Sequence, residues 1–253
     1  MSFGRTCVRL VNSFVSLILI LAILLFGSYS AYALWDNNHV YNEARSVMIQ
    51  MQELKPVLIE DIESGPTFDE LLAINQDVRG WVTLDGTSID FPILQGDSNF
   101  TYINTDVYGN FALAGSIFLD CSNNKDFSDT YNLIYGHHMA NSNMFGDLDL
   151  YRDEKFFQNN TTGQLMTVSA VYDLEVLALV VVSASDDIIF DVNMNQNADV
   201  LLSFIKDNSV FCRDVLPQPD ENTQFLALST CSSDFSDART VVITQMIRHR
   251  KPE

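Results

Sequence analysis

A run of 26 residues without a charged side chain, from position 10 to position 35, constrains the fold of this chain most. As an α-helix it would extend about 39 Å at ~1.5 Å per residue, more than the roughly 30 Å of a membrane's hydrocarbon core. Arg5 and Arg9 precede the run and Asp36 follows it. Positive charge on the near side predicts a cytoplasmic N-terminus and an extracellular remainder. We expect residues 1–35 to form a cytoplasmic stub and a single-pass transmembrane anchor in the cell membrane.

A cleaved signal peptide is the alternative interpretation of this run. Ala31, Tyr32 and Ala33 fit the small-x-small rule for cleavage sites. The run is longer than the usual apolar core of a signal peptide, roughly 7–15 residues, and this favours a retained anchor. Both interpretations place residues 36–253 outside the cell.

The exported part is strongly acidic. The whole chain has 253 residues and a net charge of −19, and without Arg5 and Arg9 the remaining 12 basic and 33 acidic residues give −21. The mean hydropathy is nevertheless slightly positive, because the uncharged run raises it. An acidic domain repels a polyanion, so nucleic acid is excluded as a partner, and so is docking on anionic lipid.

A helical segment is predicted directly after the anchor. Apolar residues recur at helical spacing from Val40 to Leu54, and Pro56 interrupts the pattern. Residues 67–70 have the form of a capping box, which predicts that a second short helix starts there. We therefore expect an N-terminal helical segment over residues 36–75, without chemistry of its own.

The pattern changes to β-structure for residues 76–253, which we expect to form a single domain. Segments rich in Val, Ile, Leu and Tyr alternate with turn-forming clusters, and one later helix is predicted at 198–206. Many strands and few helices predict a mainly β fold, a closed or nearly closed barrel of about 7–8 strands. The predicted strands lie at 81–84, 88–91, 115–120, 131–136, 166–185, 223–230 and 239–247.

Three cysteines lie in the exported part: Cys121, Cys212 and Cys231. An odd number leaves at least one thiol free or in an intermolecular bond. A single cysteine is more often buried and inert than reactive. The cysteines therefore raise the prospect of a reactive thiol without establishing one.

Cys231 has the most informative surroundings of the three. It ends one predicted strand, and Arg239 opens the next. If these strands pair antiparallel, both residues flank the same end of the sheet, where a guanidinium can stabilise a thiolate or a developing oxyanion. The alternative for Arg239 is a surface charge paired with Asp234 or Asp237.

His137 and His138 follow a predicted strand and also lie at a strand end. Side chains alternate in an extended chain, so one of the two is expected to face a given site. Adjacent histidines can bind metal, but the second pair of ligands that a zinc site needs is missing. We expect no metal and no other cofactor.

These residues resemble the pattern of the sortases, membrane-anchored cysteine transpeptidases of Gram-positive bacteria, and the wider match is to class B sortases. The resemblance runs from about residue 70 to 247, and several motifs occur in the right order. The fold it implies is a sortase-like β-barrel. The matching segments are NQDVRGW at 75–81, IDFPILQG at 89–96, GSIFLD at 115–120, YGHHM at 135–139 and LSTC at 228–231, followed by Arg239.

The resemblance implies a role for each residue that matches a motif. Cys231 would be the nucleophile and Arg239 the cationic stabiliser. His137 would be the general acid/base, because it directly follows the glycine of the Gly-His motif. Ser229 and Thr230 match residues beside the nucleophile and are expected to contact substrate.

The chain departs from the family pattern at two positions. Ala227 stands where many members have Thr, and Cys121 follows the Leu-Asp motif where Tyr is often found. Neither change removes a catalytic group. Cys121 raises the question of a disulfide with Cys212.

The implied reaction is cleavage of a C-terminal sorting motif in secreted proteins, LPxTG-like, between Thr and Gly or a similar pair. A thioacyl enzyme would then pass the protein to an amine of peptidoglycan or of its lipid-linked precursor. Two alternatives remain: an extracellular cysteine peptidase that uses water as acceptor, and an inactive membrane-tethered domain that binds surface proteins. The complete Cys, His and Arg set argues against the inactive domain.

Overall fold

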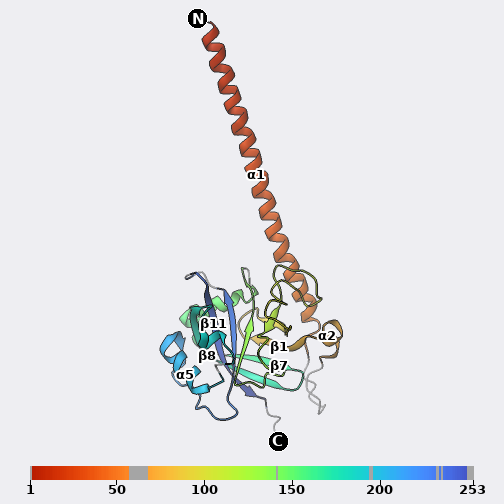
Figure 1. Ribbon diagram of the computed structural model, residues 1–253, viewed down its shortest axis with the longest axis vertical. Helices are drawn as coiled ribbons and strands as arrows, with labels where there is room; N and C mark the ends of the chain where they lie inside the picture. Colours follow the sequence, from red (N-terminus) through yellow and green to blue (C-terminus); the bar gives the residue numbers. More distant parts are fainter. Residues whose placement is uncertain are drawn as a thin grey trace. The chain divides into compact units, whose positions relative to one another are not determined.

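The computed structural model describes residues 2–56, 68–140, 142–193, 196–231, 234 and 236–249, with the side chains of residues 2–6 left aside. The chain divides into two compact units, one ending at Glu43 and one starting at Ala44. The first unit is helical. The second contains all the strands (Figure 1).

Helix α1 (Ser2–Gln52) contains both the uncharged run and the apolar stripe that follows it. The sequence predicts two helical stretches here, and the structure joins them because no proline interrupts the chain before Pro56. Side chains along the uncharged run are largely exposed. Among the described residues α1 is the one helix long and apolar enough to cross a membrane, which is consistent with the predicted anchor.

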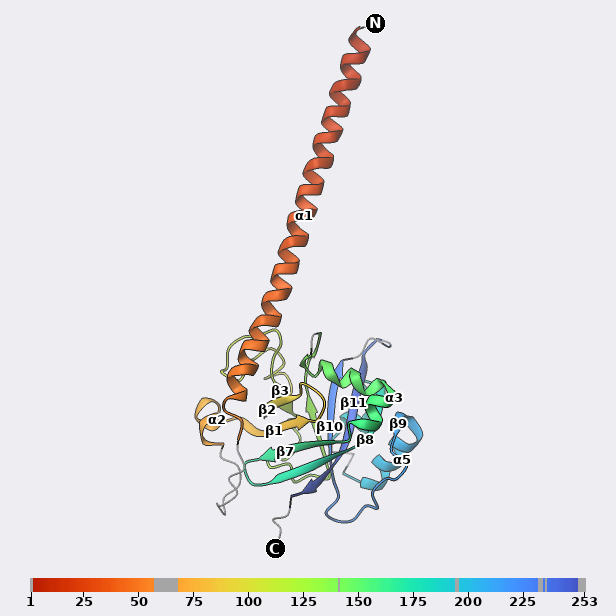
Figure 2. The same cartoon turned by 180° about the vertical axis from the view of Figure 1, so that it is seen from behind.

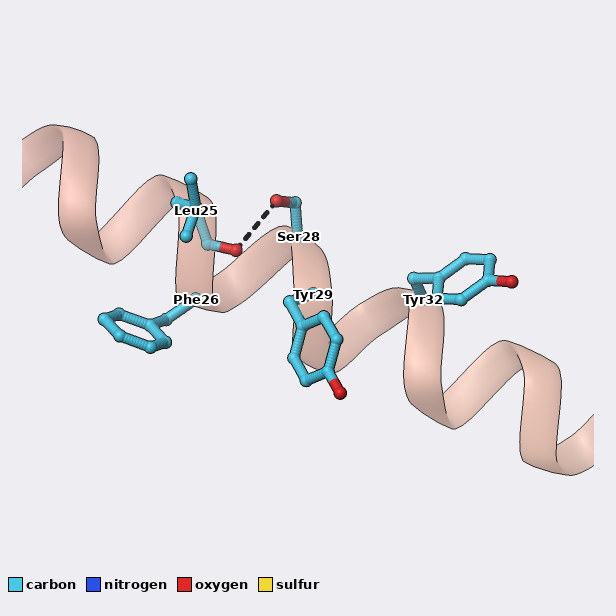
Figure 3. Close-up of a pocket in the computed structure, with 5 residues that line it drawn as sticks. All are labelled: Leu25, Phe26, Ser28, Tyr29 and Tyr32. Carbon is cyan, nitrogen blue, oxygen red and sulfur yellow. Dashed lines mark hydrogen bonds between the residues drawn. The ribbon is translucent and has the colours of Figure 1, made fainter.

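A shallow hollow lies on the surface of α1, and Figure 3 shows the residues around it. The Ser28 hydroxyl donates to the carbonyl oxygen of Leu25 at 3.0 Å. This bond satisfies the hydroxyl within the helix, so it is compatible with an apolar medium. The hollow is bordered by Leu25, Phe26, Ser28, Tyr29 and Tyr32.

Helix α2 (Asp69–Ile74) confirms the second predicted helix. The first residue of the predicted capping box, Thr67, lies outside the described residues. Phe68 occupies the N-cap position and makes no side-chain cap bond. Burial holds the helix instead, since Leu71 is fully buried in an apolar cluster that includes Met51 and Trp81.

Eight strands of the described residues close into a barrel, as predicted. They follow the order β11-β10-β4-β3-β2-β1-β7-β8, and pairing of β11 with β8 closes the ring. In a closed ring each of these eight strands has a neighbouring strand on both sides, so none is an edge strand. Their bounds are β1 (Val78–Leu84), β2 (Asp90–Leu94), β3 (Ile117–Leu119), β4 (Tyr131–Tyr135), β7 (Thr162–Thr167), β8 (Val171–Ser183), β10 (Gln224–Cys231) and β11 (Ala238–Arg248).

One predicted strand is wrong in its bounds. The expected strand at 166–185 is in fact the hairpin β7–β8, with its turn at residues 168–170. The side chain of Thr167 makes this turn, because its Oγ1 donates to the carbonyl oxygen of Ala170 at 3.1 Å and accepts from the Ala170 amide at 3.0 Å. Neither Gly nor Pro marks the turn, so the sequence pattern passes through it without a break.

Further short elements lie outside the ring. Strand β9 (Ser209–Cys212) pairs with β8, and β5 (His138–Met139) forms a small hairpin with β6 (Asn143–Met144). Short helices connect the strands. They are η1 (Gly146–Arg152), a 3₁₀-helix, and the α-helices α3 (Glu154–Asn159), α4 (Asp187–Phe190) and α5 (Ala198–Asn208).

Helix α5 confirms the helix predicted at 198–206, and it covers part of the outer barrel face. Figures 1 and 2 both show it beside β8, and it also packs against β9. Leu201 and Ile205 of α5 are fully buried in a cluster with Phe225, Ala227 and Val241. Asn197 caps the helix by accepting from two backbone amides. The cover leaves one end of β4, β10 and β11 open, and the site lies there.

Candidate active site

Three strand ends meet at one place on the barrel. Strands β4 and β10 run parallel with Tyr135 opposite Ser229, so their carboxyl ends point the same way. Strands β10 and β11 run antiparallel with Cys231 directly opposite Arg239. The expected pairing of these strands is confirmed. His137, two residues beyond the end of β4, comes to the same end.

A cavity of about 290 Å³ opens at this end. All five residues predicted for the site line it, although they come from separate parts of the sequence. The predicted residues are His137, Ser229, Thr230, Cys231 and Arg239. The other lining residues are Asn99, Phe100, Ile103, Phe118, Tyr135, Gly136, Ala184 and Phe190.

The floor of the cavity follows from the strand register. Phe118, Tyr135 and Ser229 lie opposite one another on neighbouring strands and therefore share a face. The rings of Phe118 and Tyr135 are in contact, with centroids 5.2 Å apart. Cys231 is two positions beyond Ser229 and so lies on the same face. The floor is aromatic at one side and carries the hydroxyl and the thiol at the other.

Tyr135 is held as a neutral donor. Its hydroxyl donates to Asp120 Oδ2 at 2.8 Å, and Asn99 Nδ2 donates to the same oxygen at 2.7 Å. Burial, together with the charge of Asp120, raises the pKa of Tyr135 far above its ordinary value. The phenol therefore keeps its proton at physiological pH.

Cys231 is an exposed, unpaired thiol at the rim of this cavity. All four cysteines of the chain are free. Cys121 is exposed on the β3–β4 loop, and Cys212 ends β9 opposite Ala178. The disulfide considered between Cys121 and Cys212 is thus not formed in this structure.

The two adjacent histidines have different surroundings. His137 is half-buried, lines the cavity, and its Nε2 lies 2.7 Å from the carbonyl oxygen of Ile103. A carbonyl only accepts, so Nε2 carries a proton and Nδ1 is the nitrogen left to exchange one. His138 is exposed and pairs with Asp149 Oδ2 at 2.7 Å. His138 is not among the described residues that line the cavity.

Arg239 is half-buried at the cavity, and its Nη1 donates to the carbonyl oxygen of Ala238 at 3.0 Å. Asp234, considered as its ion-pair partner, instead binds Arg152 through both carboxylate oxygens. No ion pair within the described part of the chain involves Arg239. Within the described residues the guanidinium therefore pairs with neither Asp234 nor Asp237, the two carboxylates that the surface interpretation offered.

Ser229 and Thr230 are each 2% exposed, yet their hydroxyl oxygens have no hydrogen-bond partner among the described residues. A buried hydroxyl without a partner destabilises a fold by about 1–3 kcal/mol. Such groups in a cavity wall are suited to receive a ligand's hydrogen bonds.

Several cavity residues were not predicted individually. Asn99, Phe100 and Ile103 come from a loop without regular periodicity, and only contacts across the fold reveal them. Tyr135 could have been found, because it adjoins Gly136 in the matched YGHHM segment. Within the described residues no group of three or more His, Cys, Asp or Glu side chains is arranged to hold a metal ion.

The side chains around the cavity of the closed barrel define a class of protein. An exposed thiol, an imidazole with one nitrogen available and a guanidinium outside an ion pair make up the side-chain set of a cysteine enzyme.

Gly136 permits the close packing that brings β4 to this site. A Cβ there would lie 2.5 Å from Ile117 Cδ1 and 2.6 Å from the Phe145 ring.

Known proteins identify the particular family. No protein-family model matches the chain. A class B sortase of Streptococcus pyogenes involved in pilus biogenesis is 39% identical, with a TM-score of 0.66 and coverage of 71% of this chain and 97% of that one. Sortase B from Bacillus anthracis in complex with AAEK1 is 30% identical, with a TM-score of 0.69 and coverage of 83% and 99%. Sortase B of Staphylococcus aureus is 27% identical over 237 residues, 92% of this chain and 96% of that protein.

The chain belongs to the class B sortases and is a cysteine transpeptidase. The sequence resemblance to this family is thereby confirmed. The barrel matches the solved sortase B structures in its closed sheet and its few short helices.

Proposed function

We propose that this sortase cleaves a C-terminal sorting motif through a thioacyl intermediate on Cys231 and transfers the secreted protein to a cell-wall amine. One observation carries the proposal: Cys231, His137 and Arg239 line a single cavity at one barrel end. The cavity is also lined by Ser229 and Thr230, whose buried hydroxyls lack partners among the described residues, and it has an aromatic floor for the side chains of a peptide.

The first step is attack of the Cys231 thiolate on the carbonyl carbon of the residue before the scissile bond. A strand end is a rigid mount, and its exposure gives the thiol access to a peptide in the cavity. The resulting tetrahedral oxyanion is stabilised by Arg239, whose backbone lies directly opposite that of Cys231. Backbone amide groups of the site supply further donors.

His137 exchanges protons through Nδ1. Nδ1 first accepts the proton that the Cys231 thiol gives up, and as the tetrahedral intermediate collapses it donates this proton to the departing amine, while the acyl group remains on sulfur as a thioester. The incoming amine then attacks the thioester and gives its proton to the same nitrogen. Ile103 supports this role, since its carbonyl holds Nε2 and so orients the ring.

Ser229 and Thr230 are proposed to bind the peptide. Their buried hydroxyls lack partners, so hydrogen bonds to a bound motif would offset an existing penalty. The proposed motif is LPxTG-like, cut between Thr and Gly or a similar pair. The family membership of the chain supports this substrate class.

The chain is proposed to act at the outer face of the cell membrane of a Gram-positive bacterium. Residues 1–35 would form the cytoplasmic stub and the anchor, residues 36–75 the helical segment and residues 76–253 the catalytic domain. Helix α1, which is long and apolar enough to cross a membrane, supports an anchor, and Arg5 and Arg9 support a cytoplasmic N-terminus. The acceptor would be an amine of peptidoglycan or of its lipid-linked precursor. The relative from Streptococcus pyogenes is involved in pilus biogenesis. An amine on a second protein is therefore also tested as an acceptor.

The test is a ligation assay on the full chain in detergent. Sorting-motif peptides are incubated with a peptidoglycan-type amine, with a lysine peptide or without an amine, and products are identified by mass spectrometry. We expect amine-dependent ligation that disappears in Cys231→Ala and persists in Cys121→Ala, the matched loss of another exposed thiol. Cleavage that ignores the amine would indicate a peptidase, and products formed by Cys231→Ala would reject the mechanism.

A further inference from the structure

A second set of polar side chains lies near the site without lining the cavity. Arg152, the last residue of η1, is its centre. The guanidinium contacts Asp234 through two hydrogen bonds, Nη1 to Oδ1 at 3.1 Å and Nη2 to Oδ2 at 2.5 Å. It also donates from Nη2 to Thr240 Oγ1 at 2.8 Å and from Nε to Asp149 Oδ1 at 3.2 Å.

These contacts reach the neighbours of all three proposed catalytic residues. Asp234 follows Cys231 by three positions and Thr240 follows Arg239 by one. Asp149 is the partner of His138, the residue after His137. Side chains alternate along a strand, so Thr240 points away from the face that bears Arg239.

The element that carries Arg152 is fixed by burial. Leu148 and Tyr151 of η1 are fully buried, and Asp147 Oδ2 accepts from the Ser88 amide at 2.8 Å. The hydrogen bond to Asp234 is the main cause that raises the pKa of Arg152, so the guanidinium stays charged. A fixed cation thus binds Asp234, which lies between β10 and β11, and Thr240 of β11.

We propose that Arg152 is a positioning residue, which holds Asp234, between β10 and β11, and Thr240 of β11, and thereby sets the placement of Cys231 and Arg239. This inference rests on the catalytic roles proposed above. Arg152 acts through its partners, because it is not among the described residues that line the cavity. Bidentate binding of a carboxylate by a planar guanidinium fixes both distance and direction, which a single ammonium contact does not.

An isolated ion pair at the surface contributes little to stability, and Arg152 and Asp234 are 32% and 41% exposed. If Arg152 had a purely structural role, its substitution would therefore change kcat, KM and Tm only slightly. A positioning role predicts a different pattern, because displacement of reacting groups by about 1 Å lowers turnover up to about 100-fold without a comparable loss of substrate binding.

The test measures kcat and KM for peptide ligation by the full chain in detergent, together with Tm. For Arg152→Ala and Asp234→Asn we expect kcat to fall about 10- to 100-fold, with KM within about twofold of wild type. The kcat of the double variant should fall no further than that of the more impaired single variant, because both substitutions remove the same contact between Arg152 and Asp234. Arg152→Lys should recover part of the kcat.

Arg213→Ala is the matched control. Arg213 is also half-buried and donates to Phe157 O at 2.5 Å and to Val176 O at 3.0 Å, away from the site. We expect it to lower Tm at least as much as Arg152→Ala and to leave kcat unchanged. Wild-type kcat in Arg152→Ala, or an equal kcat loss in Arg213→Ala, would overturn the positioning role. If Arg152→Ala does not fold, the isosteric Asp234→Asn decides the question by the same criteria.

Amide hydrogen exchange of residues 236–240 separates this proposal from the catalytic one. Exchange there should rise in Arg152→Ala and Asp234→Asn but not in Arg213→Ala. Should wild type show no Cys231-dependent ligation, the proposed function fails, while the exchange still shows whether Arg152 holds residues 236–240. Unchanged exchange together with unchanged kcat rejects the positioning role alone.

Discussion

Two stretches of the outer face of β10 have opposite character. Phe225 and Ala227 lie beneath α5 and are fully buried among apolar side chains. Ser229 and Cys231, two and four positions beyond Ala227 on the same face, border a cavity with an unpartnered hydroxyl and an exposed thiol. The strand ladder continues through both stretches, so backbone pairing does not distinguish them.

The difference between the two stretches is their cover. Where α5 packs on the sheet, apolar burial stabilises the barrel, by about 25 cal/mol for each Å² removed from water. Where the cover ends, polar groups stand without partners and make the fold less stable than a filled surface would. Natural proteins keep such local losses at functional sites. Substitutions should therefore affect stability in the covered stretch and turnover in the open one.

The largest expected effect distinguishes the two histidines at the open end. His137→Ala should lower ligation turnover about 10²- to 10⁴-fold, since the general acid/base is removed. His138→Ala should stay within a few-fold of wild type, because His138 pairs with Asp149 outside the cavity. Steady-state assays of both variants decide the assignment, and the reverse result would transfer the role to His138.

The next effect concerns the cation opposite the thiol. Arg239→Ala should lower kcat about 10²- to 10³-fold while the Tm stays near that of wild type, because the guanidinium acts on the developing oxyanion. Arg239→Lys retains the charge but loses the planar donor geometry and should recover only part of the rate. Turnover at the wild-type rate in Arg239→Ala would refute the role.

A core substitution tests the covered stretch. Leu201→Ala in α5 should lower the free energy of unfolding by about 2–5 kcal/mol, since the leucine is fully buried in the cluster over β10. Well below the Tm, kcat should be unchanged. Urea unfolding and ligation assays on the same preparation check both expectations, and a large kcat loss in the folded variant would contradict the separation of the two stretches.

A smaller effect is expected from the buried hydroxyl of the open stretch. Ser229→Ala should leave the free energy of unfolding unchanged or raise it by up to about 1 kcal/mol, because an unpartnered hydroxyl is removed. The KM for the sorting peptide should rise several-fold. Thermal unfolding with and without peptide measures both effects, and a clear loss of stability without peptide would indicate a partner in the free protein.

The smallest expected effect concerns the thiol of Cys212 in the covered stretch, compared with free cysteine in solution. Cys212 packs against the covered cluster, and burial raises the pKa of its thiol. A raised pKa means less thiolate at a given pH, so alkylation of Cys212 should reach half its maximal rate at a higher pH than alkylation of free cysteine. Mass spectrometry of iodoacetamide-treated chain resolves the sites. Alkylation of Cys212 as fast as that of free cysteine at pH 8 would contradict its burial.

Much of the site could be predicted because two of its residues are close in sequence. Cys231 and Arg239 end one strand and open the next, so hairpin pairing alone places them together. His137 is nearly a hundred residues away from Cys231, and its arrival depends on the parallel pairing of β4 with β10. Local sequence patterns carry no signal for the pairing of β4 with β10. Only the resemblance to the family predicted that His137 lies close to Cys231.

The fold was predictable to a similar extent. Alternating apolar residues located most barrel strands, and helical periodicity located α5. The β7–β8 turn was missed because a threonine side chain makes it. The cavity wall formed by Asn99 and Ile103 was missed because irregular loops have no period to detect. The Ile103 carbonyl that orients His137 is a backbone group and leaves no trace in residue type.

The order of strands has a consequence for how the enzyme becomes active. Strand β11 is the last barrel strand along the chain, and it completes the ring by pairing with both β10 and β8. A growing chain emerges N-terminus first, so the ring stays open until β11 has been released. Arg239 lies on that closing strand and Cys231 just before it. Closure of the barrel and assembly of the surroundings of Cys231 therefore both require β11.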